Sequence, residues 1–287
     1  MFASACGRAS SFTRPVATST RLVDGTISTV FGTFIVLNNE GWAITAGHTF
    51  DSFARFQSDQ NKIRELDGLN ADRTGADVIR KDPKLITNHS FWWGWDGVQL
   101  NNVTVNRKID IAIGRLQNFD PSKVGGYPVL ADPSTVVPGR TVCRLGYPFM
   151  GLKTEFDEKL NGFRIPRIDH RSNLYCNDGM VSRIFSPGKG PDGVDVTYID
   201  TSTPGIQGQS GGPLVDADGN LCGMQVSIYS IPMGIQPTIE CDGSRVVENQ
   251  FVNIGRALHV GTIREMLDAR GIRYRSVDNP EEYRIDY

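Results

Sequence analysis

Three short segments of the sequence carry the residue types that acyl transfer requires. His48 ends the segment TAGH, Asp110 begins DIAI, and Ser210 lies within GQSGGP. A serine hydroxyl is a weak nucleophile at neutral pH, so a base must take its proton, and histidine has the pKa suited to that task. A carboxylate can hold the imidazole in the correct tautomer and stabilise its charged form. The order His, Asp, Ser therefore predicts a catalytic triad.

The glycines around Ser210 suit the remaining requirement, which is a pair of donors aimed at the oxyanion of the tetrahedral intermediate. Gly208 permits a backbone conformation that is closed to bulky side chains. The N–H groups of Gly208 and Ser210 can then point into one hole. Gly211 and Gly212 let the chain pass close behind the serine. We therefore predict an oxyanion hole formed by Gly208 and Ser210.

Each segment taken alone has an ordinary structural interpretation. TAGH is typical of a strand end, DIAI of a strand, and GQSGGP of a glycine-rich turn. Their occurrence together, in this order, is what favours catalysis. Asp110 heads an apolar strand, whereas the other aspartates considered for the same role do not. Those competitors are Asp72, Asp77, Asp82 and Asp96.

Short strands must position these residues. The 31 glycines and 15 prolines suit many strands joined by tight turns. A helix is predicted at GTIREMLDARG, with Thr262 as its N-cap and Gly271 as its stop, and a short helix at 51–66 is an open alternative to a loop. Two all-β halves with one terminal helix predict two small barrels side by side.

The expected domains each carry part of the site. They are an N-terminal β-barrel at 1–125 with His48, Asp110 and an insertion at about 50–97, a C-terminal β-barrel at 126–260 with Ser210, and a C-terminal helix and tail at 261–287. The insertion is longer than a minimal barrel needs. Long insertions beside an active site often act as lids or exosites.

Composition excludes several classes of partner. The net charge is −2 with 22% charged residues, which predicts neither a nucleic-acid nor a membrane partner. No apolar stretch approaches the 18 residues of a transmembrane helix. The arginines before Asp24 leave an organellar transit peptide as the alternative to a first strand at 12–22.

Cysteine and histidine spacing predicts no metal site and no cofactor. The five cysteines are irregularly spaced without a CxxC pair. Their odd number favours a reducing, cytoplasmic location over a disulfide framework. The three histidines outside the expected triad lack partners at metal-ligand spacing, so we expect packing or surface roles for them; they are His89, His170 and His259.

Taken together, the three segments resemble the chymotrypsin/trypsin-like serine peptidases. The resemblance implies an all-β fold of two perpendicular six-stranded antiparallel barrels with the site in the cleft between them. It also implies a serine endopeptidase that acts on protein or peptide substrates through an acyl-enzyme on Ser210. The segments at 145–149, 179–184 and 200–224 are similar in style to the bacterial Htr-type and glutamyl-type branches. Only about 27 residues follow Val260, so the PDZ module of Htr-type enzymes is not expected.

Departures from the digestive members of the family bear on activation and specificity. Gln209 replaces the acidic residue that receives the new N-terminus after zymogen cleavage, and no cysteine lies between Cys6 and Cys143 to form the disulfide beside the histidine. The resemblance assigns a substrate pocket to five residues, with a small or medium apolar residue preferred before the cleaved bond. These residues are Pro204, Gln225, Val226, Ser227 and Ile228.

Two alternatives to an active endopeptidase stay open. One is a latent protease that needs a regulatory partner or ligand to order its loops. The other is a protease fold used as a binding module without catalysis, because a fold alone does not establish function. The complete set His48, Asp110 and Ser210 favours catalysis over the second alternative.

Overall fold

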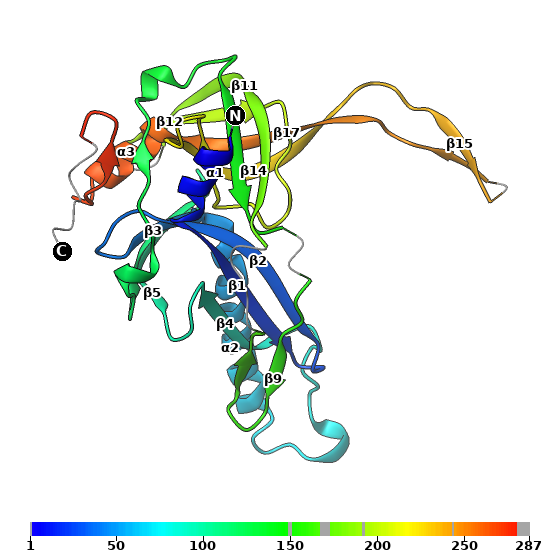
Figure 1. Cartoon of the computed structure of the whole chain (residues 1–287). Helices are drawn as coiled ribbons and strands as arrows, with labels where there is room; N and C mark the ends of the chain where they lie inside the picture. The colour runs from blue at the N-terminus through cyan, green and yellow to red at the C-terminus, as the bar shows by residue number, and fades with distance from the viewer. Residues whose placement is uncertain (1, 149–150, 167–172, 191–192, 243, 280–287) are drawn as a thin grey trace.

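Strands rich in β-branched and aromatic residues form a six-stranded antiparallel sheet in the first part of this computed structural model (Figure 1). The structure describes residues 2–148, 151–166, 173–190, 193–242 and 244–279. The strand order is β4-β1-β2-β3-β6-β5. Its members are β1 Thr13–Leu22, β2 Ile27–Val36, β3 Trp42–Ala46, β4 Ile86–Trp93, β5 Gln99–Asn106 and β6 Ile111–Gln117.

The second sheet closes on itself, because β13 pairs with β8 on one side and with β14 on the other. Six antiparallel strands form this ring in the order β13-β8-β11-β12-β17-β14, and the short strands β7 and β18 continue from β14 in parallel. The bounds are β7 Val129–Leu130, β8 Thr141–Gly146, β11 Tyr175–Lys189, β12 Asp195–Thr201, β13 Pro213–Val215, β14 Leu221–Pro232, β17 Phe251–His259 and β18 Arg275–Ser276. The predicted mostly β fold with two six-stranded antiparallel units is confirmed.

The C-terminal helix is also confirmed, with a different cap. Helix α3 spans Val260–Asp268, and its N-cap is His259, whose Nδ1 accepts a hydrogen bond of 3.0 Å from the Gly261 N–H. The prediction of Thr262 as the cap is wrong, because Thr262 lies inside the helix and bonds to Asp195 of β12 through its hydroxyl. Gly271 follows the helix with a positive φ of 63°.

Two further helices frame the sheets. Helix α1, Ala3–Ser10, was not expected from the sequence; Ala5 and Ala9 are fully buried, and the helix contacts β8 and β13 of the second sheet. Helix α2, Asp51–Leu69, packs against β4 and extends the helix considered at 51–66. Four single turns of 3₁₀ helix are also present among the described residues: η1 Gly47–Phe50, η2 Gly75–Asp77, η3 Pro121–Lys123 and η4 Pro133–Thr135.

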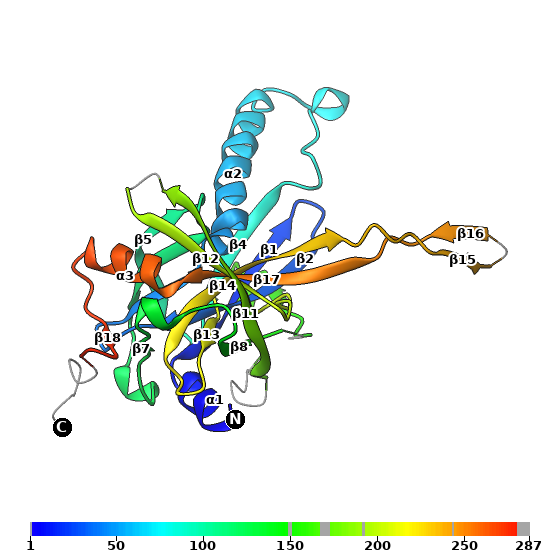
Figure 2. The same ribbon diagram turned by 90° about the horizontal axis from the view of Figure 1, so that it is seen from above.

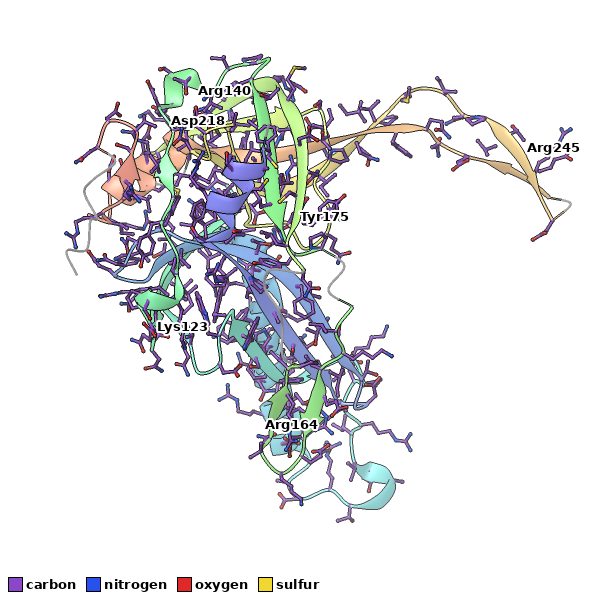
Figure 3. All side chains as sticks on the ribbon, in the orientation of Figure 1. Lys123, Arg140, Arg164, Tyr175, Asp218 and Arg245 are labelled. Atoms are coloured by element: carbon purple, nitrogen blue, oxygen red, sulfur yellow. The ribbon has the colours of Figure 1, made fainter. Side chains whose placement is uncertain are left out.

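A two-stranded arm leaves the second barrel. Strands β14 and β17 run outward together, and the arm ends in the hairpin of β15 Thr238–Cys241 and β16 Ser244–Val247 (Figures 1 and 2). Arg245 lies near its tip, far from Arg140 and Asp218 on the barrel (Figure 3). Several large apolar side chains of the arm are exposed: Ile231, Met233, Ile235, Val247, Phe251 and Val252. A second small hairpin, of β9 Glu155–Asp157 and β10 Gly162–Arg164, lies at the α2 end of the molecule (Figure 1).

Candidate active site

Two paired strand ends bring His48 and Asp110 together. His48 lies in η1 directly after β3, Asp110 directly precedes β6, and Ala46 of β3 pairs with Ile111 of β6. Asp110 has a positive φ of 59°, a conformation that aspartate tolerates better than most residues. The pairing of β3 with β6 therefore fixes the carboxylate beside the ring.

Both oxygens of the Asp110 carboxylate bind His48. Oδ2 lies 2.8 Å from the ring Nδ1, and Oδ1 accepts a 2.7 Å hydrogen bond from the His48 backbone N–H. A proton held on Nδ1 by this carboxylate leaves Nε2 as the atom that can accept a proton. The predicted pairing of His48 with Asp110 is present in the geometry.

The electrostatic surroundings favour the charged form of His48. The hydrogen bond to Asp110 raises the pKa of His48 above its ordinary value, partial burial acts in the opposite direction, and the negative charges of Asp110 and Asp51 add to the rise. Asp51, at the start of α2, also forms an ion pair with Arg107.

The loop before Ser210 has the backbone conformation that only glycine adopts without strain. Gly208 has a φ of +101°, and a Cβ there would lie 2.4 Å from the Tyr147 carbonyl oxygen. Gly211 has a φ of +82°, and a Cβ there would lie 2.1 Å from the Thr33 carbonyl oxygen. Both glycines are therefore required by close approach as well as by dihedral angle.

Thr33 of β2 attaches this loop to the first sheet. Its N–H donates to the Ser210 carbonyl at 2.9 Å, and its hydroxyl donates to the Gly208 carbonyl at 2.7 Å. Within the described ranges, the N–H groups of Gly208 and Ser210 have no hydrogen-bond acceptor. Two unpaired N–H groups beside a serine are what an oxyanion hole requires. Sequence reasoning missed Thr33, which looks like any threonine of a strand.

His48 and Ser210 line one cleft of about 290 Å³. The rest of its wall comes from the first sheet, from the start of α2 and from the loop before Ser210: Thr18, Thr20, Val30, Phe31, Gly32, Thr49, Ser52, Gln207 and Gly208. Both candidate residues are described, and no hydrogen bond joins their side chains. Catalytic hydrogen bonds are often long without substrate. The structure thus brings the nucleophile and base candidates to one cleft.

The five residues assigned to the substrate pocket belong to β14 and to the segment before Ser210. None of them lines the described cleft at His48 and Ser210. The Pro204 segment packs on β14, because a Cβ at Gly205 would lie 2.5 Å from Nε2 of Gln225 and 3.3 Å from Ile228. Gln225 is buried, and its Nε2 donates to the Ser227 carbonyl at 2.7 Å. The segment before Ser210 therefore packs directly against β14 at this place.

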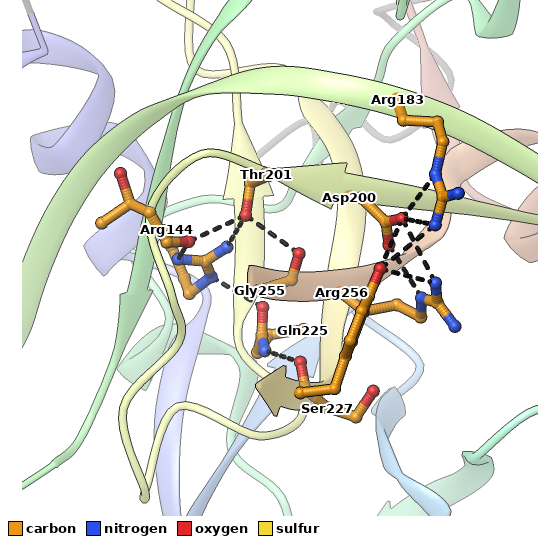
Figure 4. A network of polar contacts seen from close by, with 10 residues as sticks. Arg144, Arg183, Asp200, Thr201, Gln225, Ser227, Gly255 and Arg256 are labelled. Atoms are coloured by element: carbon orange, nitrogen blue, oxygen red, sulfur yellow. Dashed lines mark hydrogen bonds and ion pairs between the residues drawn. The ribbon is translucent and has the colours of Figure 1, made fainter. Parts of the chain in front are cut away.

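A buried arginine holds this region together (Figure 4). Arg144 of β8 is 2% exposed; its Nε donates to Gln225 Oε1 at 2.7 Å, and its Nη1 donates to the Thr203 and Pro204 carbonyls at 3.2 Å each. Burial lowers the pKa of Arg144 to about 10. None of the ion pairs between described residues includes it. Its only sequence signal was a charged residue inside the apolar run TVCRLG.

A second polar cluster is formed by side chains of β11, β12, β14 and β17 (Figure 4). Asp200 of β12 is 1% exposed and accepts hydrogen bonds from Arg256 at 2.8 Å and from the Tyr229 hydroxyl at 2.8 Å. Arg183 also pairs with Asp200. Although burial alone would raise the pKa of Asp200, the hydrogen bonds to these partners lower it below its ordinary value. Burial raises the pKa of Tyr198, also on β12; the charge of Arg256 acts in the opposite direction, and the charge of Asp110 adds to the rise.

The two described histidines outside the candidate triad, His89 and His259, have structural roles. His89 lies among Phe53, Phe56 and Phe91, and His259 caps α3. Burial lowers the pKa of each to about 4. His170 lies outside the described residues.

In the described part of the chain, no group of three or more His, Cys, Asp or Glu side chains could hold a metal ion. Among the described helices, none is long and apolar enough to span a membrane.

The fold and the site together define a class of protein. Residues 32–224, more than half of the chain, match the family described as Trypsin-like peptidase domain. The chain therefore belongs to the trypsin-like peptidase domain family, which confirms the resemblance inferred from the three segments. No curated protein shows significant similarity to the sequence.

Solved structures of proteases are similar to this chain at low sequence identity. The Rv3671c protease from M. tuberculosis in its active form is 15% identical, with a TM-score of 0.48 over 94% of this chain and 86% of that chain. The HtrA-type protease AlgW with a decapeptide is 16% identical, with a TM-score of 0.49 over 94% of this chain and 68% of that chain. The structure of the HtrA-type protease AlgW with a tripeptide is 17% identical, with a TM-score of 0.48 over 94% of this chain and 63% of that chain. The chain therefore spans less than two thirds of the length of that protein.

Proposed function

We propose that this protein is a serine endopeptidase whose nucleophile is Ser210. In the proposed cycle, His48 takes the proton of the Ser210 hydroxyl as the oxygen attacks a peptide carbonyl. His48 then donates that proton to the leaving amine, and water hydrolyses the acyl-enzyme by the reverse transfer. Asp110 orients the ring and stabilises its charged form. The observation that carries the proposal is the contact of both Asp110 oxygens with His48 at 2.7 and 2.8 Å, on a cleft shared with Ser210.

The free N–H groups of Gly208 and Ser210 support the oxyanion role. They would bind the negative oxygen of the tetrahedral intermediate in place of water, and removal of one such donor typically costs ~10²–10³ in kcat. No metal or organic cofactor is invoked in this cycle. The substrates are proteins or peptides, since the family acts on peptide bonds, and a chain segment would lie against Val30 and Phe31 of the cleft.

Labelling with a fluorophosphonate tests the proposal. The probe forms a covalent bond with a serine only where a base activates the hydroxyl. We expect labelling of the wild-type protein and a fall of at least about 10³ in the labelling rate for Ser210→Ala and for His48→Ala. Circular dichroism and thermal unfolding of each variant serve as the control for folding. Equal labelling of wild type and Ser210→Ala would overturn the assignment.

A latent form of the same enzyme is a second candidate. Two observations favour it: no hydrogen bond joins the described side chains of His48 and Ser210, and Gly205 packs directly on Gln225. In this form a partner or ligand would separate the loop at 204–206 from β14 and admit the residue before the cleaved bond. Slow labelling of the pure protein that rises at least about tenfold in cell extract would support latency. Equal rates would exclude it.

The residue preference at the cleaved bond belongs to the same proposal. We assign the pocket to the residues named from the family resemblance, with a small or medium apolar residue preferred; they are Pro204, Gln225, Val226, Ser227 and Ile228. Cleavage-site profiling on a peptide library checks this assignment. Cleavage only after basic residues would contradict it. A non-catalytic binding module would show neither labelling nor cleavage under any of these conditions.

A further inference from the structure

Three cysteines from distant parts of the chain lie together on the second barrel. Cys6 is in α1, Cys143 in β8 and Cys176 in β11. The sulfur atoms of Cys6 and Cys143 are 3.5 Å apart, although these residues are separated by 137 positions in the sequence. Cys176 is the third member, and the pairing of β11 with β8 places it next to Cys143. We call this group the thiol cluster.

Strand register and helix packing produce the cluster. In the antiparallel pair of β8 and β11, Cys143 lies opposite Asp178. Cys176 is two residues before Asp178, so it shares a face with Cys143 and is its diagonal neighbour. Helix α1 contacts β8 and carries Cys6, with Ala5 and Ala9 fully buried on its packed side (Figure 2). The cluster is therefore a consequence of the fold and not of a local motif.

The three thiols differ in exposure and in acidity. Cys143 is buried, Cys6 is half-buried and Cys176 is exposed. The hydrogen bond with Cys143 lowers the pKa of Cys176 to about 6, whereas burial raises the pKa of Cys6 to about 11. Because the thiolate is the nucleophile, Cys176 is the member that can react first with a dissolved oxidant.

We propose that the thiol cluster is a site of reversible oxidation, at which hydrogen peroxide is reduced and Cys6 becomes joined to Cys143 by a disulfide. The Cys176 thiolate attacks one peroxide oxygen, forms a sulfenic acid and releases hydroxide. The hydroxide takes the proton of the Cys143 thiol, and the resulting thiolate attacks the Cys176 sulfur, forms a Cys143–Cys176 disulfide and expels hydroxide. This hydroxide takes the proton of the Cys6 thiol, whose thiolate attacks the Cys143 sulfur and releases the Cys176 thiolate. In total, two thiols become one disulfide and one peroxide becomes two water molecules.

The disulfide would join the helix that precedes the first sheet to a strand of the second barrel. It would close a loop of 137 residues, and long loops gain most from a cross-link. We expect the melting temperature to rise by about 5–10 °C on oxidation. This inference does not depend on the proposed peptidase activity, because the cluster contains none of the residues assigned to that activity.

Peptide mapping of the oxidised protein tests the proposal. The reduced wild-type protein is treated with hydrogen peroxide, its remaining thiols are alkylated, and it is digested without reductant. We expect a loss of two hydrogen atoms from the intact mass, a linked peptide pair containing Cys6 and Cys143, and a higher melting temperature. Dithiothreitol should reverse all three changes.

Variants separate the roles of the three sulfurs. Cys6→Ser should lose the rise in melting temperature, Cys176→Ser should slow disulfide formation at least about tenfold, and Cys222→Ala should change neither result, since Cys222 lies outside the cluster. The proposal is overturned if wild-type oxidation leaves Cys6 and Cys143 alkylated, or if the disulfides found exclude Cys143. Unchanged kinetics in Cys176→Ser would refute its role as the entry point for peroxide.

Discussion

The carboxylate of Asp110 binds both the ring and the backbone of one histidine. That arrangement restrains the tautomer and the orientation of His48 at once, because the ring cannot rotate without losing the 2.8 Å contact. It also shifts the acid–base behaviour of the ring, since the pKa of His48 rises through this hydrogen bond more than partial burial lowers it. Asp51 contributes a weaker effect of the same sign.

Removal of the Asp51 charge should therefore move the pH dependence of labelling. His48 accepts a proton only when it is neutral, so labelling falls as the pH drops through its raised pKa. Asp51→Asn lowers that pKa, and we expect the acidic limb of the fluorophosphonate labelling rate to shift to lower pH by about 0.2–0.5 units. Asp67→Asn, an exposed ion-paired residue on the same helix, is the matched control. A shift to higher pH would contradict this electrostatic account.

The candidate triad residues could be proposed from the sequence because chemistry restricts their types and their surroundings. A histidine at a strand end, an aspartate heading an apolar strand and a serine between glycines form a rare combination. Thr33, Arg144 and Tyr198 had no such signal. Threonine and tyrosine are ordinary strand residues, and the burial of Arg144 depends on carbonyl groups that approach only after folding.

At the scale of elements, strand β8 anchors the segment that leads to Ser210 through hydrogen bonds from one of its side chains. Arg144 projects from β8 and donates to the Thr203 and Pro204 carbonyls, and its Nη2 donates to the Thr201 hydroxyl at 2.6 Å. A single side chain thus satisfies several buried acceptors. Removing it takes a donor from each of these acceptors, although the Thr203 and Pro204 carbonyls each keep a second donor. A buried acceptor that is left unpaired costs about 1–3 kcal/mol.

Arg144→Met should lower both stability and reactivity. We expect the free energy of unfolding in urea to fall by about 2–4 kcal/mol, and the labelling rate to fall because the loop before Ser210 loses its anchor. Arg164→Met removes an exposed arginine paired with Asp157 and should cost less than about 0.5 kcal/mol. Equal losses for the two variants would show that Arg144 does not anchor the loop.

Local pattern predicted the strands well, but it predicted α1, the arm and the cap of α3 poorly. Helix α1 has no side-chain cap and no acidic residue in its first turn, and its stability comes from burial against β8 and β13. The arm has the alternation of an ordinary strand pair, so its departure from the barrel left no signal. The cap of α3 was misassigned because His259 takes a role that the sequence favours for threonine.

At the scale of the whole molecule, buried histidines make stability depend on acid. The Nδ1 of His259 accepts the Gly261 N–H and must be unprotonated to do so. Its pKa is lowered to about 4 by burial, although a hydrogen bond with the Val136 backbone acts in the opposite direction. The unfolded chain therefore binds more protons than the folded chain between pH 6.5 and about 4, and stability falls as the pH falls through that window.

His259→Asn should remove part of this acid sensitivity while keeping a cap on α3, since asparagine is a good N-cap. We expect the wild-type protein to lose up to about 3 kcal/mol through His259 between pH 7 and pH 4, and the variant to lose correspondingly less. Urea unfolding at both pH values measures the difference. Burial also lowers the pKa of His89, so the variant keeps the part of the pH dependence of stability that His89 causes. Parallel stability profiles of the two proteins would contradict this prediction.

The hydrogen bond from the Thr33 N–H to the Ser210 carbonyl also makes the Thr33 amide a reporter of the contact between the two sheets. The amide proton belongs to the first sheet, but its acceptor is the carbonyl of the candidate nucleophile, which precedes β13 of the second barrel. Hydrogen exchange at Thr33 therefore requires the two halves to part at that point, and its protection factor measures how often they do. A motion that opens the interface would appear there as faster exchange, even while both sheets stay folded.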